Sequence, residues 1–411
     1  MPRKQKPLFP IVTLLWVGII LTLALQWPLL RLLGVQPPLP WVPLLPGIAV
    51  FAAAYLLSWS AEVAQIDIPP ALALGLLALV AVLPEYAVDM YFAWRAGSNP
   101  SYIPYAAANM TGSNRLLIGL GWPLVVWVCV WKTKKNEVVL KKRLSVEISI
   151  LMAATVYAFI IPIKGTLSWV DSVVLGSLFL WYFYRILKGN VESQELEEGA
   201  AEMIASWGVS VRRGVALVLF FLAGAVIFLA AQPFAEGLLS AGRKFGINEF
   251  ILVQWLAPLA SESPEFIVAA IFAYRGLASS SFNTLLSSKL NQWTLLVGML
   301  PLAFAFSARS FHPMVLDANQ CEEIFLTAAM SLLAVVMILD FKFHKMEAGV
   351  LFVLFAVQTL YPAVQGWVGI SAIKVRYGFA YLYLLISVLL LVTQPKKRME
   401  LRDLWRTFFR N

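Results

Sequence analysis

The chain has 411 residues, of which 60% are apolar and 13% are charged, and it contains 15 Trp and 26 Phe. This balance excludes an ordinary water-soluble domain and is typical of a protein that crosses a membrane many times. The formal net charge is +9, but the basic residues stand in short clusters between apolar stretches, which indicates membrane topology rather than nucleic-acid binding. The two cysteines, Cys129 and Cys321, lie in separate stretches, so the sequence predicts neither a disulfide framework nor a cysteine metal site.

Apolar stretches of about 20 residues are long enough to cross a bilayer. The twelve that we predict lie near residues 10–32, 40–60, 70–96, 102–131, 145–163, 167–187, 213–234, 248–275, 280–308, 320–340, 347–364 and 374–393. The first is long for a signal peptide and lacks a small-residue cleavage site, so we interpret it as a span. If the N-terminus is cytoplasmic, the main basic clusters all fall on the cytoplasmic side. This predicts cytoplasmic termini, by default in the plasma (inner) membrane.

Two segments outside the predicted spans are charged. The connection 188–212 is acidic, and we interpret it as a solvated linker or short surface helix. A regulatory cation-binding loop is the alternative, which the lack of an Asp-rich, Gly-punctuated pattern disfavours. The C-terminal tail alternates basic and large apolar residues, which predicts an amphipathic helix on anionic lipid.

One stretch of the sequence occurs twice. Residues Pro84 to Arg95 recur as Pro264 to Arg275 at a constant offset of 180, with Pro, Glu, Val, Phe, Ala and Arg at matching places. The offset matches the second to sixth spans with the seventh to eleventh. Because each half then has an odd number of crossings, the two halves enter the membrane from opposite sides. The sequence therefore predicts an all-α polytopic membrane protein with two inverted-topology five-helix repeats and one extra helix at each end. We divide it into an extra helix (1–38), a first repeat (39–187), an acidic linker (188–212), a second repeat (213–366), and an extra helix with a basic tail (367–411).

The repeated Pro-Glu pair is the main candidate site. Proline interrupts the helical hydrogen bonds, and a carboxylate inside a membrane needs partners, so both residues are costly there. We expect Glu85 and Glu265 to converge on a divalent cation, for which calcium is suited because it takes oxygen ligands. Backbone carbonyls at Ala81 and Ser261, one turn earlier, are expected to add ligands. The alternative is that each glutamate only pairs with an arginine or caps a broken helix.

A second pair of polar stretches follows in each half, at 109–114 and 283–289. Their candidate ligand oxygens come from Asn109, Ser113, Asn114 and Ser288. Close packing of small residues between helices is an equally good explanation of these stretches.

These motifs resemble the alpha repeats of the cation/calcium exchanger superfamily, which includes the sodium/calcium exchangers. The first half matches through Leu83-Pro84-Glu85 and Ala108-Asn109-Met110-Thr111-Gly112-Ser113-Asn114, and the second through Ser263-Pro264-Glu265 and Ser287-Ser288. The resemblance implies that the two glutamates bind calcium, or exchange calcium against a monovalent ion. It also implies ten spans, so that the first and last spans here are additions.

The sequence departs from the family pattern at several positions. Ala81 stands where the resemblance implies a hydroxyl, Glu262 and Gln292 flank the second site, and about five residues are inserted near 99–105 of the first half. Lys289 stands in place of the asparagine of the Gly-Ser-Asn motif. Its ammonium either replaces a coupling cation beside Glu262 or Glu265, or forms a static pair with Glu262, or extends to the cytoplasmic face.

Asp89 lies one turn after Glu85 and has Ala269 as its counterpart. It either widens the cation site or pairs with Arg115.

The leading hypothesis is a secondary active cation antiporter that exchanges calcium for sodium or protons by alternating access. A divergent transporter of a monovalent cation, protons or another solute, with Lys289 in place of a coupling ion, is the alternative. A membrane-embedded enzyme ranks below both, because the sequence shows neither a nucleophile–base pair nor a phosphate-binding glycine loop. We expect no cofactor and no nucleic-acid partner. The expected partners are the transported ions and membrane lipid.

Overall fold

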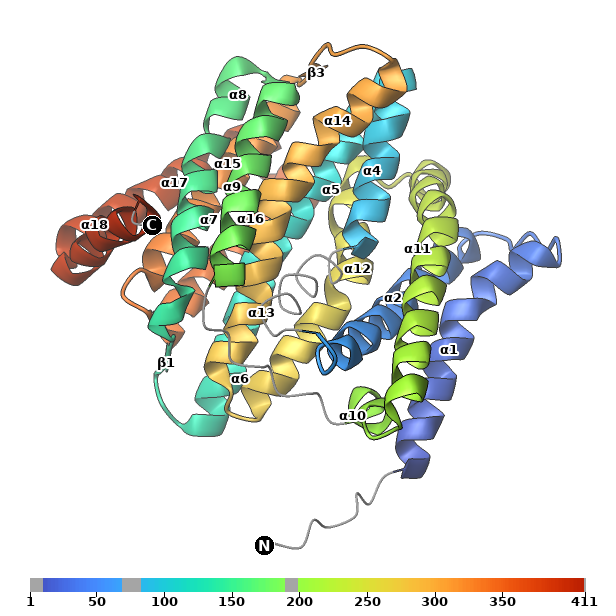
Figure 1. The fold of residues 1–411 in the computed structure, drawn as a ribbon. Coiled ribbons are helices and arrows are strands. Elements are labelled where there is room, and N and C mark those ends of the chain that lie inside the picture. The colour runs from blue at the N-terminus through green and yellow to red at the C-terminus, as the bar shows by residue number, and fades with distance from the viewer. Residues whose placement is uncertain (1–9, 69–82, 189–198, 410–411) are drawn as a thin grey trace, which may run out of the picture. The chain divides into compact units, whose positions relative to one another are not determined.

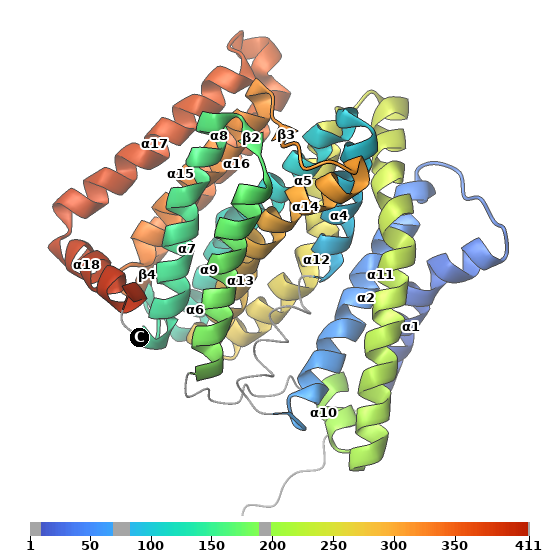
Figure 2. The ribbon, with the colours of Figure 1, turned by 45° about the horizontal axis from the view of Figure 1, so that its top comes forward.

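The computed structural model describes residues 10–68, 83–188 and 199–409, and nearly all of its regular elements are helices. Ten of the described helical segments are long and apolar enough to cross a membrane. They coincide with ten of the twelve predicted spans and confirm the all-helical, polytopic class. The other two predicted spans correspond to α4 (Leu83–Ser98) and α16 (Lys345–Val368), and part of the span 70–96 lies outside the described residues. Figures 1 and 2 show the helices in two views.

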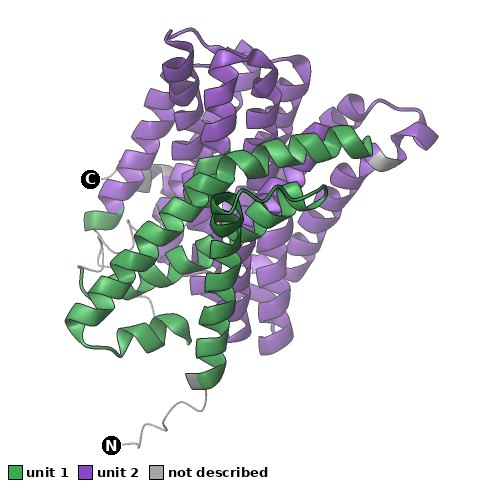
Figure 3. Cartoon of the chain, turned by 90° about the vertical axis from the view of Figure 1, so that its right-hand side faces the viewer, with its two compact units in different colours: residues 1–88, 186–246 green, residues 89–185, 247–411 purple. Residues whose placement is uncertain are grey.

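The helices form two compact units, which Figure 3 shows in green and purple. Unit 1 consists of residues 1–88 and 186–246, and unit 2 of residues 89–185 and 247–411. Each unit therefore takes segments from both sequence repeats. Helix α4 is continuous across the division at residues 88 and 89.

Unit 1 is built around the first helix of each repeat. Its helices are α1 (Pro10–Leu32), α2 (Trp41–Ala64), α10 (Ala200–Ala205) and α11 (Val209–Phe245). Glycine allows α2 and α11 to pack closely, because a Cβ on Gly237 would lie 2.9 Å from the Pro43 backbone. The described part of the predicted linker forms α10 and the start of α11. Three of the α10 residues, Ala200, Ala201 and Ile204, are buried and Glu202 is exposed, so this part is the short surface helix, one of the two forms predicted for the linker.

Unit 2 contains the remaining helices. Those of the first repeat are α5 (Ile103–Leu116), α6 (Trp122–Thr133), α7 (Ser145–Ala158), α8 (Ile160–Lys164) and α9 (Trp169–Lys188). Those of the second repeat and the C-terminal region are α12 (Glu249–Tyr274), α13 (Ala278–Asn291), α14 (Val297–Ala308), α15 (Ala318–Ile338), α16, α17 (Ala372–Thr393) and α18 (Pro395–Phe409). Trp122, Phe282 and Phe343 are fully buried and in mutual ring contact. They hold α6, α13 and the strand before α16 together.

Two short antiparallel ribbons connect the repeats within unit 2. Strand β1 (Glu137–Val139) pairs with β4 (Lys342–His344), with Val138 opposite Phe343. Strand β2 (Thr166–Leu167) pairs with β3 (Met314–Val315), with Thr166 opposite Val315. Each ribbon takes one strand from each repeat. The Lys342 ammonium pairs with Glu137 across the first ribbon and holds the pKa of that carboxyl below its usual range.

Both repeats contain a π-helical turn at the same place. Helix α5 continues through η2 (Leu117–Gly121) into α6, and α13 continues through η4 (Gln292–Leu296) into α14. The offset between the two turns is 175 rather than 180, because the first repeat carries an additional 3-10 turn, η1 (Pro100–Tyr102). This turn, together with the longer C-terminal end of α4, accounts for the insertion that the sequence predicts near 99–105. π-helical turns inside α-helices occur frequently at functional sites.

The C-terminal tail forms a helix, α18, as predicted. One of its lysines, Lys397, is buried and donates to the carboxylates of Asp340 and Glu347 at 3.3 and 3.1 Å. Lys396 and Arg406 are more than half exposed. The helix is therefore anchored to unit 2 through the buried Lys397.

Candidate cation site

Helix α12 carries two buried acids on consecutive turns. Glu262 is fully buried and Glu265 is 7% exposed, and a carboxylate oxygen of one lies within 4.8 Å of a carboxylate oxygen of the other. Their spacing of three residues places them on the same face of the helix. Pro264 lies inside the helix and has no N–H to bond to the carbonyl of Ala260. This segment therefore offers two carboxylates. It also offers the Ala260 carbonyl oxygen, which receives no helical hydrogen bond from Pro264.

Helix α13 and the turn after it contribute neutral groups to these acids. The Gln292 amide donates to Glu262 and lies 3.5 Å from the Ser288 hydroxyl. Both side chains are buried. The Ser261 hydroxyl instead donates to the Ala257 carbonyl at 3.2 Å within its own helix. The sequence-predicted residues Glu262, Glu265, Ser288 and Gln292 thus lie in one part of unit 2.

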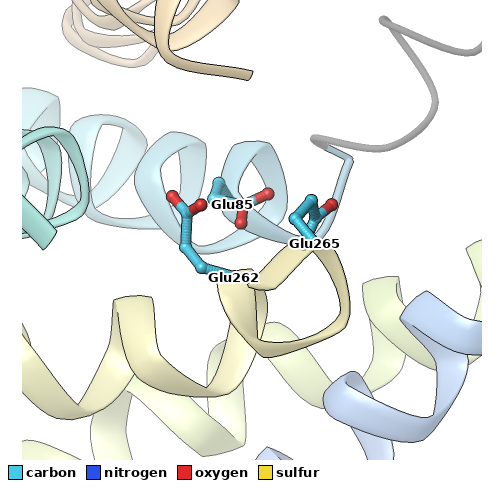
Figure 4. Close-up of side chains that lie close together, drawn as sticks. All are labelled: Glu85, Glu262 and Glu265. Carbon is cyan, nitrogen blue, oxygen red and sulfur yellow. The ribbon is translucent and has the colours of Figure 1, made fainter. Parts of the chain in front are cut away.

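The first Pro-Glu pair lies at the start of α4. Glu85 is in the first turn of this helix and is 1% exposed. Figure 4 shows its side chain together with those of Glu262 and Glu265. Ala81, the predicted source of a carbonyl ligand, lies outside the described residues.

Asp89 lies one turn after Glu85 and is fully buried. It accepts a hydrogen bond of 3.0 Å from the Asn109 amide of α5. The alternative that Asp89 pairs with Arg115 is wrong, because Arg115 pairs with Glu323 of α15. Asp89 and Asn109 instead form a buried polar pair between α4 and α5.

Lys289 lies in the interior of unit 2. Its side chain is fully buried, so the expectation that it extends to the cytoplasmic face is wrong. The ammonium donates to Asn114 Oδ1 at 2.7 Å and lies 4.3 Å from the centre of the Trp293 ring. It also interacts electrostatically with Glu262. The direct contacts of the ammonium are thus an amide oxygen and an aromatic ring, and Glu262 acts on it as a nearby charge.

The remaining predicted residue, Ser113, is fully buried, and its hydroxyl donates to the Asn109 carbonyl at 3.0 Å. Close packing around Gly112 accompanies this polar stretch, because a Cβ on Gly112 would lie 1.9 Å from the Gln254 carbonyl oxygen. Close packing of small residues, one of the two explanations of this stretch, therefore applies to α5, and cation ligation by the stretch stays a prediction.

Sequence reasoning missed a second group of buried charges. Arg115 and Glu323 pair across 208 residues of sequence, and Gln254 donates to the same glutamate at 2.8 Å. An isolated arginine in the fourth predicted span and a Glu-Glu pair in the tenth were the available signals. A charged residue inside a span requires a partner, but the spacing does not identify it.

The chemistry of this region suits a hard cation. Buried carboxylates, amide oxygens, hydroxyls and backbone carbonyls are oxygen ligands of the kind that calcium takes, usually six to eight at a time. Histidine and cysteine, which would favour softer metals, are absent from the sequence stretches that carry these residues. The described residues of α12, α13 and α5 therefore fit an alkali or alkaline-earth cation.

Comparison with known proteins agrees with this chemistry. The family model "Sodium/calcium exchanger protein" matches the chain twice, at residues 39–188 and 215–364. These two matches correspond to the two predicted repeats. No curated protein matches the chain.

Three solved structures resemble the chain to different degrees. The crystal structure of the H⁺/Ca²⁺ exchanger CAX is 43% identical, has a TM-score of 0.90, and the match covers 97% of this chain and 98% of that one. Native YfkE is 16% identical with a TM-score of 0.59, covering 85% and 98% of the two chains. The sodium-calcium exchanger NCX_Mj is 19% identical with a TM-score of 0.51, covering 76% and 95%. The last two show a shared fold, while the two family matches span most of the sequence. The chain therefore belongs to the sodium/calcium exchanger family and is an integral, multi-pass membrane protein.

Proposed function

We propose that this protein is a secondary active antiporter that exchanges calcium for protons. The observation that carries the proposal is the Pro-Glu pair that occurs at the same position of both repeats, with Glu85 and Glu265 both buried in apolar helices. A carboxylate at such a position is costly unless it has a counter-charge. A transported cation supplies that charge while it is bound, and protons supply it when the cation leaves.

The proposed ligands extend beyond these two glutamates. Glu262 adds a third carboxylate, which accepts a hydrogen bond from the Gln292 amide, and Gln292 also donates to the Ser288 hydroxyl. Backbone carbonyls near Ala81 and Ser261 and the amide and hydroxyl groups of Asn109, Ser113 and Asn114 supply the neutral oxygens that a calcium ion needs. Glu85 and Glu265, by pseudo-symmetry, provide the main charge.

Protons are preferred to sodium as the coupling ion for two reasons. The 43% identical relative is described as an H⁺/Ca²⁺ exchanger. The sequence also has Ala81 and Val82 where the resemblance implies hydroxyl ligands. Fewer neutral oxygens weaken a site for a bare sodium ion, whereas a carboxylate accepts a proton without further ligands.

Lys289 is proposed to act as a fixed positive charge beside this site. Its ammonium is held by Asn114 and Trp293 inside unit 2. A tethered cation reduces the number of free positive ions needed to neutralise three carboxylates. This role makes Lys289 a residue that tunes the coupling rather than a ligand of calcium, while the buried carboxylate of Asp89 widens the cation site.

The decisive experiment is uptake of isotopic calcium into proteoliposomes, driven by an outward proton gradient or, separately, by an outward sodium gradient. We expect proton-driven uptake by the unmodified protein and loss of uptake in the Glu85→Gln, Glu265→Gln double variant. The matched control is Glu202→Gln, which removes an exposed carboxylate of α10. Uptake retained by the folded double variant overturns the proposed site, and uptake driven by sodium alone overturns the proposed coupling ion.

The proposed orientation places both termini in the cytoplasm, with the protein in the plasma (inner) membrane. The distribution of basic clusters supports it. Impermeant thiol labelling of single cysteines introduced at Gly34 and Lys135, in a background without Cys129 and Cys321, tests the topology. Labelling from outside only at position 34 is expected, and the reverse pattern contradicts the orientation.

A further inference from the structure

Four charged side chains lie together in unit 2, on helices α5, α15 and α17, and three of them are buried while Arg376 is 15% exposed. Arg115 pairs with Glu323, and both side chains are at most 2% exposed. The Arg376 Nε donates to Glu322 Oε2 at 2.6 Å, and its Nη1 lies 3.4 Å from Glu323 Oε1. We call Arg115, Glu322, Glu323 and Arg376 the charge cluster.

The charge cluster needs a helix that lies outside both repeats. The second family match ends at residue 364, and Arg376 lies beyond it on α17. Glu322 and Glu323 are adjacent and almost fully buried, and Arg115 balances the charge of one of them. An unpaired buried carboxylate is strongly unfavourable, so the second glutamate of α15 also needs a counter-charge. Arg376 of α17 supplies it.

The cluster also fixes the part of α5 that carries Asn114. Arg115 follows Asn114 directly, and its guanidinium lies between Glu323 and the Trp255 ring, with 5.2 Å to the ring centre. Asn114 in turn accepts the hydrogen bond from Lys289. A continuous chain of contacts thus links Arg376 of α17, through Glu323 of α15 and Arg115 and Asn114 of α5, to the ammonium of Lys289.

A pocket of about 570 Å³ lies beside the cluster and is lined by Arg115, Glu323 and Arg376. Apolar packing is therefore incomplete on this side of Arg115. The ion pairs and hydrogen bonds, which have defined directions, hold the guanidinium in place there. We therefore expect that a change in the charges of the cluster alters the position of α5.

We propose that Arg376, Glu322, Glu323 and Arg115 are positioning residues, which set α5 so that Asn114 holds Lys289 beside the cation site. According to this proposal, α17 contributes to cation exchange by positioning α5, and it is more than an additional membrane anchor. The inference rests on the proposed function, because it requires that Asn114 and Lys289 act in cation exchange.

The test compares the Glu322→Gln, Arg376→Gln double variant with the unmodified protein. Removing both partners avoids leaving an uncompensated buried charge, so this variant is expected to fold. The matched control is Lys374→Gln, which removes an exposed positive charge two residues away on α17. Two readouts are used: hydrogen exchange of the backbone amides of residues 109–116, and calcium half-saturation against maximal rate in proteoliposomes.

We expect the double variant to show faster exchange at 109–116 and a half-saturation concentration raised by about fivefold with a nearly unchanged maximal rate. Arg376→Lys is expected to be intermediate, because an ammonium does not bridge two carboxylates as a guanidinium does. Unchanged exchange and half-saturation in the double variant overturn the proposal. If the double variant does not fold, wild-type values in Arg376→Lys overturn it instead.

Failure of the proposed function gives a different result. If the proposed function is wrong, the unmodified protein takes up no calcium under either gradient. The hydrogen-exchange readout at 109–116 does not depend on transport, so it still tests whether the charge cluster positions α5.

Discussion

Lys289 donates a 2.7 Å hydrogen bond to Asn114, and these two residues occupy the same position of the two repeats. Both are fully buried. A strictly symmetric protein would place two asparagines here. The second repeat instead supplies a cation and the first repeat supplies its acceptor, so the two halves of the site have become chemically different.

Replacing Lys289 by asparagine restores that symmetry and removes the fixed positive charge. We expect the ion preference to shift, with sodium-driven calcium uptake increasing relative to proton-driven uptake, because a mobile cation must then replace the ammonium. Initial uptake rates under each gradient measure the shift. Lys289→Arg is the control that keeps the charge, and an unchanged ratio in Lys289→Asn would remove Lys289 from the coupling mechanism.

Asp89 gives the first repeat a carboxylate that the second repeat lacks. In Asp89→Asn the partner Asn109 remains close to an amide of the same shape, so the loss is mainly one of charge. We expect the half-saturation concentration for calcium to rise by about tenfold, equivalent to about 1.4 kcal/mol. Wild-type half-saturation in a folded Asp89→Asn protein would mean that Asp89 serves the packing of α4 on α5 only.

Gly112 is predicted to be essential for stability. A Cβ at this position would meet the Gln254 backbone oxygen at 1.9 Å, so Gly112→Ala forces α5 and α12 apart and costs at least about 1–3 kcal/mol. At Gly176 of α9 an added Cβ meets nothing within 4 Å, and Gly176→Ala is expected to stabilise by about 0.5–1 kcal/mol. Thermal unfolding in detergent compares the two variants, and equal midpoints would contradict the proposed close contact.

Asp67, just after α2, is expected to make stability depend on pH. Arg212 donates to its carboxylate at 2.6 and 3.1 Å and Arg213 donates at 3.1 Å, and these bonds hold the pKa of Asp67 well below its usual range. Because the folded-state pKa is depressed, the stabilisation is complete above the unfolded-state value of about 3.9 and is lost as the pH falls through the folded-state value.

The matching measurement is the difference in unfolding midpoint between the unmodified protein and Asp67→Asn. We expect a constant difference from pH 8 to about pH 5, and a smaller one below about pH 4. A difference that grows as the solution becomes more acidic would show that the sign of the linkage is wrong. High salt should reduce the difference, since the pair is partly exposed.

Periodic and repeated features could be predicted from the sequence. The twelve apolar stretches predict the helical class, because membrane insertion imposes length and polarity on each span. The 180-residue repeat predicts the two halves that the family model matches. Glu262 and Glu265 lie on one face of α12 as predicted, since helix geometry fixes their mutual position.

Long-range pairings could not be predicted in the same way. Nothing in the spacing shows that Arg115 reaches Glu323, or that Lys289 turns to Asn114 rather than to a carboxylate. These choices depend on how helices from distant parts of the sequence pack. The π-helical turns at Leu117–Gly121 and Gln292–Leu296 also carry no composition signal, because an extra residue in a helical turn changes the register without requiring a special residue.

The two ribbons have a consequence for the origin of the chain. Neither β1 nor β2 has its partner in its own repeat, since β1 pairs with β4 and β2 pairs with β3. A half-length ancestor, alone in the membrane, would have left the backbone groups of both strands without these bonds. In this chain the other repeat supplies them, so each half depends on the other for the pairing of its strands.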